Sequence, residues 1–147
     1  HEPGAVLTAV SSIVPEPKIA AHLPQITRHF ASDRLEDILA SLESDPEEWA
    51  AREYALLRTK SPQACKVALR LLALSAALTD FADNMAMEYR VAARVINRPD
   101  FAEGVRAVIV DKDNAPAWNP ATPAGVAENL LDSIFAPLPA DMEWTPR

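Results

Sequence analysis

Apolar residues recur along most of this chain at the spacing of one face of an α-helix. The clearest set follows the i, i+3, i+4, i+7 pattern and consists of Leu35, Ile38, Leu39 and Leu42. Asp33 and Glu36 have the spacing of a capping box just ahead of it. This pattern predicts a helix over residues 34–43.

Prolines preceded by a capping residue mark the starts of further helices. Asp45-Pro46 and Ser61-Pro62 both place an N-cap side chain before a proline at the first helical position. With the apolar periodicity that follows each start, the sequence predicts helices over about 46–59, 62–78, 80–97, 99–111 and 123–135. Two weaker helical segments precede them, at 5–14 and 21–31.

The predicted fold class is all-α. Strands that alternate between apolar and polar residues are not found, apart from one ambiguous apolar run at 105–110. We divide the chain into an N-terminal helical and linker segment (1–33), a helical region (34–136) and a loose tail (137–147).

Composition excludes several classes of partner. The chain has 147 residues, enough for one compact domain, and a net charge of −7, which disfavours nucleic acid and anionic lipid. No apolar run approaches the roughly 20 residues of a membrane-spanning helix. The single cysteine, Cys65, forms no intramolecular disulfide, so we expect a cytoplasmic protein.

Residues with reactive side chains do not form a catalytic pattern. Cys65 has no histidine near it in sequence, and we interpret it as a core thiol. His22 and His29 lack further ligands at metal-binding spacing, so we interpret them as solvated or capping side chains. We therefore predict no metal site and assign no catalytic residue.

Glu88 shares a predicted helix face with Phe81 and Met85. Burial of an unpaired carboxylate is costly, so Glu88 needs a cationic partner. We predict that Arg106, or another arginine, pairs with it as a structural clamp.

The segment 99–120 joins a glycine-containing helix to a charged loop. Gly104 inside a helix costs about 1 kcal/mol relative to alanine, which indicates close approach of another backbone. Trp118 lies between two prolines in the loop. Lys112 follows the predicted helix end, where it either complements the helix dipole or contacts a phosphate.

Four motifs of the chain resemble the crotonase (enoyl-CoA hydratase/isomerase) superfamily. Ser61-Pro62-x-Ala64-x-Lys66 is similar to the start of a late helix in that superfamily. The other three are Met87-Glu88-Tyr89-Arg90, Pro99-Asp100-Phe101-x-Glu103-Gly104-Val105-Arg106-Ala107 and Asp111-Lys112-Asp113-x-x-Pro116-x-Trp118-x-Pro120. In this order these three are similar to the C-terminal portion of the 3-hydroxyisobutyryl-CoA hydrolase family. Ordinary hydratases of the superfamily tend to have Glu-Lys-Arg, then proline and phenylalanine, at 111–113 and 118. The hydrolase branch is therefore favoured, with hydratase or isomerase activity as the alternative.

The resemblance implies an enzyme whose chemistry lies outside this chain. In the superfamily a core of ββα repeats supplies the oxyanion hole and the acidic residues, and that core precedes the region matched here. The expected reaction is hydrolysis of 3-hydroxyisobutyryl-CoA, in valine catabolism. Coenzyme A enters as part of the substrate, and no tightly bound cofactor is expected.

Two positions acquire binding roles from the resemblance. The lysine that corresponds to Lys112 reaches the CoA phosphate or adenine region in related hydratases, often across a subunit boundary. Ile109 replaces an aromatic residue that packs near the adenine there. The implied partners are the acyl-CoA substrate, the chain's own N-terminal crotonase core and a possible homo-oligomer.

Two hypotheses follow for the chain as a whole. In the first it is a C-terminal fragment of the hydrolase and is inactive alone. In the second it is a non-catalytic helical interaction subunit that assembles with a separately encoded core.

Overall fold

A computed structural model describes residues 3–10 and 17–144 of the chain. These residues form helices and turns and no strand, so the all-α prediction is confirmed. The chain separates into two compact units, His1–Ala31 and Ser32–Arg147.

The described residues of the first unit, 3–10 and 17–31, form two short α-helices and a 3-10 turn. They are α1 (Pro3–Val10), the turn Lys18–His22 and α2 (Leu23–His29). Pro24 lies in the first turn of α2, as its sequence predicts. The helix predicted over 5–14 is present up to residue 10, and its remainder lies outside the described residues. His29 is 2% exposed, so its interpretation as a solvated side chain is wrong.

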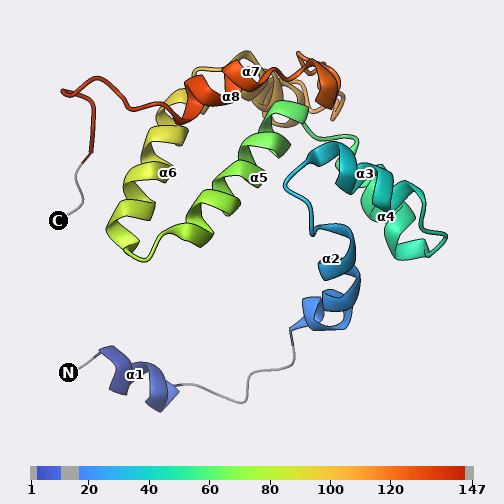
Figure 1. The fold of residues 1–147 in the computed structure, drawn as a ribbon, viewed down its shortest axis with the longest axis horizontal. Coiled ribbons are helices and arrows are strands. Elements are labelled where there is room, and N and C mark those ends of the chain that lie inside the picture. Colours follow the sequence, from blue (N-terminus) through green and yellow to red (C-terminus); the bar gives the residue numbers. More distant parts are fainter. Residues whose placement is uncertain (1–2, 11–16, 145–147) are drawn as a thin grey trace. The chain divides into compact units, whose positions relative to one another are not determined.

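Residues 32–144 of the second unit form six α-helices. Figure 1 shows α5 and α6 as consecutive helices joined at one end by a short loop. The helices are α3 (Leu35–Glu43), α4 (Glu48–Leu57), α5 (Pro62–Ala77), α6 (Phe81–Val95), α7 (Pro99–Val105) and α8 (Glu128–Phe135).

Helix α5 takes part in both hydrophobic cores of this unit. One core lies where α3 meets α4, with Ile38 and Leu42 at 1% and 0% exposure, and Leu69 of α5 packs against it. The other core unites α5, α6 and α8 through Val67, Val91 and Ile134. Because one helix contributes to both clusters, its position is set from two sides.

Ion pairs connect α5 to helices on either side. Lys66 Nζ lies 2.7 Å from Glu36 Oε1 of α3, and Arg70 Nη2 lies 2.7 Å from Asp132 Oδ1 of α8. The Lys66 pair also explains why the capping box predicted for α3 is wrong: Glu36 is turned toward Lys66. The N-cap of α3 is Arg34, without a side-chain cap bond.

Two helices begin later than predicted. α4 begins at Glu48, because Asp45 Oδ1 accepts a hydrogen bond from Glu47 N at 2.9 Å and closes a turn ahead of the helix. α8 begins at Glu128, since Pro123–Gly125 forms a separate 3-10 turn. By contrast, α5 has the predicted cap, Ser61, and α6 begins at Phe81, next to its predicted start, with Asp80 as its cap.

The tail predicted to be loose makes specific contacts with α6 over its described residues, 137–144. Arg90 Nε donates to Glu143 Oε1 at 3.0 Å, and Arg94 Nη2 donates to the Pro137 carbonyl at 2.7 Å. The rings of Tyr89 and Trp144 lie 5.7 Å apart.

Candidate functional site

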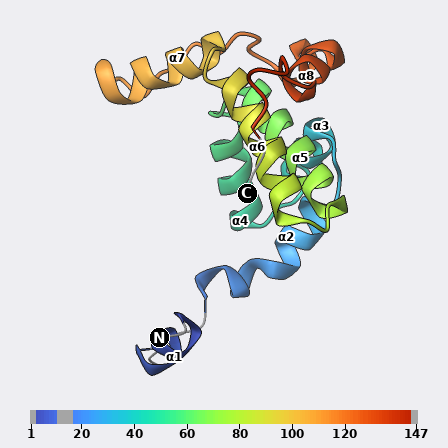
Figure 2. The ribbon, with the colours of Figure 1, turned by 90° about the vertical axis from the view of Figure 1, so that its left-hand side faces the viewer.

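The segment 99–120 begins with a helix whose last turn is wider than an α-turn, and a loop follows. α7 starts at Pro99, and the next turn, Arg106–Val110, is a π-helix. Its i, i+5 bond runs from Asp111 N to the Arg106 carbonyl at 2.8 Å. The ambiguous run 105–110 is therefore helical. In Figure 2, α7 extends away from the other helices of its unit.

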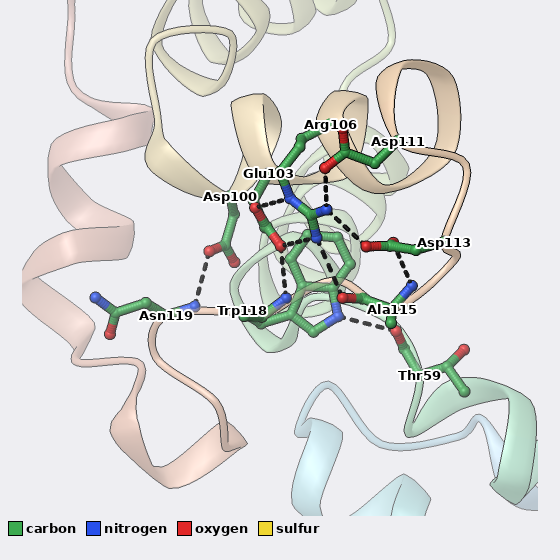
Figure 3. Close-up of polar contacts among 10 residues, drawn as sticks. Thr59, Asp100, Glu103, Arg106, Asp111, Asp113, Ala115, Trp118 and Asn119 are labelled. Carbon is green, nitrogen blue, oxygen red and sulfur yellow. Dashed lines mark hydrogen bonds and ion pairs between the residues drawn. The ribbon is translucent and has the colours of Figure 1, made fainter.

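Arg106 is the centre of a charged cluster that ties this helix to the following loop (Figure 3). Its Nε and Nη2 donate to the two oxygens of Glu103, both at 2.8 Å. Its Nη1 donates to Asp111 Oδ2 and to Asp113 Oδ2, both at 2.7 Å. One guanidinium thus binds three carboxylates, and Nη2 also reaches the Ala115 carbonyl at 3.2 Å.

This cluster shifts the titration of its members. Hydrogen bonds from Arg106, and then from the Ala117 N–H, lower the pKa of Glu103 to about 2. Hydrogen bonds from Arg106 and from the Ala115 N–H likewise lower the pKa of Asp113. The carboxylates in turn raise the pKa of Arg106. Glu103, Asp113 and Arg106 are therefore all ionised at neutral pH.

Lys112 lies between two aspartates of the cluster and adopts a left-handed backbone conformation. Its φ is 56°, and that of Asn114 is 54°. Residues with a Cβ seldom adopt such angles unless the surrounding structure enforces them. Here the bonds of Asp111 and Asp113 to Arg106, and of Asn114 N to the Ala107 carbonyl at 3.0 Å, hold the turn.

The ring of Trp118 covers Gly104. A Cβ added to Gly104 would lie 3.4 Å from Cη2 of the indole. The predicted close approach is therefore present, but an aromatic side chain makes it and the prediction of a second backbone was wrong. The indole Nε1 also donates to the Thr59 carbonyl at 2.9 Å, which fixes the loop against the residues before α5.

A buried carboxylate links the starts of α5 and α7. Asp100, which is 6% exposed, accepts hydrogen bonds from Ser61 Oγ and from Asn119 N, the latter at 2.9 Å. Ser61 Oγ in turn accepts from Ala64 N at 3.1 Å as the cap of α5. One carboxylate therefore connects two helices and the loop after Trp118.

An apolar groove of about 400 Å3 runs between the start of α5 and α7. Its lining includes Val95, Phe101, Val105, Val108, Ile109 and Trp118. Val108 and Ile109 are 59% and 64% exposed. Ile109 therefore lines this groove, whereas Lys112 lies outside it on the exposed loop.

The predicted clamp between Glu88 and Arg106 is wrong. Glu88 is exposed and accepts a hydrogen bond from Asn84 Nδ2 at 3.0 Å, on its own helix. α6 is rotated so that Val91, at 5% exposure, faces the core, while Phe81 of the predicted buried face is 77% exposed. Arg106 is satisfied instead by carboxylates of its own segment.

Two contacts in this site were not predicted from the sequence. Glu103 and Arg106 are three residues apart on a helix, a spacing at which opposite charges meet, so their pairing had a visible signal. The contact of Ser61 with Asp100 spans 39 residues and had none.

Residues 3–10 and 17–144 contain no helix with the length and apolar character that a bilayer crossing requires. Nor do the His, Cys, Asp and Glu side chains in those ranges form a group that could hold a metal ion.

Comparison with known proteins shows relatives over almost the entire chain. The family described as enoyl-CoA hydratase/isomerase matches residues 3–135. The 3-hydroxyisobutyryl-CoA hydrolase, mitochondrial, of Danio rerio is 36% identical over 77% of this chain. The protein of the same name from Gallus gallus is 34% identical over 80% of it. The chain spans only 29% and 30% of the length of these two relatives.

A solved structure shows the same arrangement of helices. An enoyl-CoA hydratase from Rhodobacter sphaeroides 2.4.1 superposes with a TM-score of 0.83 at 32% identity. The match covers 97% of this chain and 42% of that protein.

Proposed function

Because this chain belongs to the enoyl-CoA hydratase/isomerase family, we propose that it is the helical part of a CoA-thioester hydrolase. The proposed reaction converts 3-hydroxyisobutyryl-CoA and water to 3-hydroxyisobutyrate and CoA. Support comes from the two vertebrate relatives, which bear that enzyme's name. Both names also contain the word mitochondrial. A cytoplasmic location therefore stays a prediction for this chain.

In this proposal, the helical part of the enzyme contributes part of the coenzyme A site, with Lys112 as the phosphate contact. The observation that carries this proposal is the left-handed backbone of Lys112, held by the contacts of its two neighbours with Arg106. Such conformations concentrate at functional positions. The lysine is exposed, as a contact to a charged ligand requires.

The proposed partner of the apolar groove is the crotonase core of the same enzyme. Phe101, Val105, Val108 and Ile109 are exposed along one short segment, and contiguous apolar surface of this kind is typical of an interface. With the core supplying the reacting groups, the chain by itself is expected to release no CoA from the ester. Turnover by the purified chain would contradict this part of the proposal.

The test of the CoA-binding role is Lys112→Ala in the complete enzyme that contains this chain. Loss of a phosphate contact made equally in ground and transition states raises KM for the CoA ester and leaves kcat unchanged. Arg52→Ala is the matched control, since Arg52 is exposed and pairs with its neighbour Glu53. An unchanged KM in Lys112→Ala would remove Lys112 from the site.

Enoyl-CoA hydratase activity is the second candidate, favoured by the match to the Rhodobacter sphaeroides enzyme. The two activities are separated by assaying the complete enzyme with 3-hydroxyisobutyryl-CoA for thiol release and with an enoyl-CoA for loss of the conjugated double bond. Thiol release without hydration supports the hydrolase.

A further inference from the structure

Arg106 binds both of the carboxylates that flank Lys112 in the sequence, Asp111 and Asp113. We infer that Arg106 is a positioning residue that holds these two carboxylates away from the Lys112 ammonium and so leaves the ammonium available for a phosphate of coenzyme A. This inference rests on the proposed CoA-binding role of Lys112 and adds a residue that acts through it.

Without Arg106, the carboxylates nearest to Lys112 would compete for it. Asp111 and Asp113 are its immediate neighbours, with side chains 50% and 43% exposed, and a lysine side chain is long and flexible enough to pair with either. An ammonium paired in this way attracts a phosphate less strongly. The two aspartates, no longer neutralised by Arg106, would also repel the phosphate.

The geometry of the cluster explains why the central residue is an arginine. The planar guanidinium directs Nε and Nη2 at Glu103 while Nη1 serves both aspartates. Glu103 also accepts from the Ala117 N–H at 2.7 Å, so the anchor of the guanidinium is itself fixed to the loop. A lysine at 106 has three donors on a single nitrogen, too few for the five hydrogen bonds that Arg106 makes from three separate nitrogens.

The test compares two substrates in the complete enzyme: the CoA ester, and the pantetheine ester of the same acyl group, which lacks every phosphate. We expect Arg106→Gln to raise KM for the CoA ester about threefold to fivefold, the range of one exposed charge interaction. KM for the pantetheine ester should stay within about twofold of the wild-type value. Arg52→Gln removes the same charge elsewhere and should leave both constants unchanged.

A rescue experiment distinguishes the positioning role of Arg106 from a general structural role. Replacing the two aspartates in the same background, as Arg106→Gln/Asp111→Asn/Asp113→Asn, should return KM for the CoA ester close to the wild-type value. Where Arg106→Gln alone does not fold, Arg106→Gln/Asp111→Asn takes its place, and its remaining Asp113 should raise that KM above the value of the triple variant.

Three results would overturn the inference. The first is an unchanged KM for the CoA ester in Arg106→Gln, and the second is an equal rise of KM for both substrates in that variant. The third is a triple variant that does no better than the variants that keep an aspartate. Lys112→Ala shows whether the proposed CoA contact has failed or only the proposed role of Arg106. An unchanged KM there removes the proposed CoA contact itself, whereas a raised KM with an inert Arg106→Gln refutes the role of Arg106 alone.

Discussion

The indole of Trp118 lies on Gly104 at a distance that just admits a methyl group, since a Cβ there would be 3.4 Å from Cη2. Gly104→Ala should therefore change the free energy of unfolding by less than about 1 kcal/mol. The added methyl group would make a van der Waals contact with the indole, and alanine has a higher helix propensity than glycine. Gly125 is the contrasting position: its Cβ would lie 2.8 Å from Cβ of Pro120. Gly125→Ala should cost about 1–3 kcal/mol.

Thermal denaturation of the two glycine variants checks this pair of expectations. A larger loss of stability in Gly104→Ala than in Gly125→Ala would contradict the packing described for Trp118.

Ser61 has two roles, as the cap of α5 and as a donor to the buried carboxylate of Asp100. Ser61→Ala removes both and leaves one carboxylate oxygen without this donor, so we expect a loss of about 2–3 kcal/mol in stability. Asp80→Ala removes an exposed cap from α6 and should cost only about 1 kcal/mol. Denaturant titration of both variants measures the difference, and equal losses would argue against a structural role of the Asp100 contact.

Glu103 should make stability depend on acid pH. Its pKa falls from 4.5 to about 2 on folding, because Arg106 and the Ala117 N–H stabilise the ionised form. The folded state thus binds the proton less readily, and this stabilisation is complete above pH 4.5 and disappears as the pH falls toward 2.

Melting temperatures between about pH 6 and pH 2 test the contribution of Glu103. This range includes the pKa of its carboxyl in the unfolded state and in the folded state. Glu103→Gln should be less stable than wild type at the upper end, and the gap should close toward the lower end. Glu53→Gln, at an exposed pair with Arg52, serves as the control. A constant gap across the range would show that the carboxylate charge is not what stabilises the cluster.

Cys65 should react slowly with thiol reagents in the folded protein. Burial disfavours its thiolate and raises the pKa of the thiol, and the thiolate is the reactive form. Alkylation by iodoacetamide at pH 8, followed by mass spectrometry, should therefore be much faster in denaturant than in buffer. Equal rates would contradict the half-buried position of the side chain.

The left-handed backbone of Lys112 predicts that glycine stabilises this position. A residue with a Cβ pays roughly 1 kcal/mol or more for such a φ, which glycine avoids. Lys112→Gly should therefore be more stable than Lys112→Ala in thermal denaturation, although both lack the ammonium. A less stable Lys112→Gly would indicate that the turn is not held in this conformation.

The sequence predicted helices well wherever a cap and a long apolar period coincided. α5 satisfies both conditions, and its cap was correct, while α6 was located from its apolar period. Their exposed faces were not predictable, because periodicity ranks residues around a helix without telling which side another helix covers. Phe81 and Glu88 were placed inside for this reason, and both are exposed.

The sequence singled out the segment that holds the candidate site, but it did not predict the bonds within that segment. Gly104, Arg106, Lys112 and Trp118 all lie in the segment singled out from the motif, and the tertiary partner of Arg106 was wrong because the nearby Glu103 was overlooked. The link from Ser61 to Asp100 depends on how two helix starts meet, which no local pattern contains.

The π turn at Arg106–Val110 determines the side of the helix on which Asp111 lies. In a regular α-helix a residue five positions on lies about 140° around the axis, whereas the wider turn brings Asp111 back to the side of Arg106. Removal of one residue from the turn would leave an ordinary α-turn in which Asp111 follows Arg106 by four positions, a spacing at which side chains also meet. Natural relatives that are one residue shorter here should consequently keep the pairing of the arginine with the first aspartate and have a regular helix in place of the π turn.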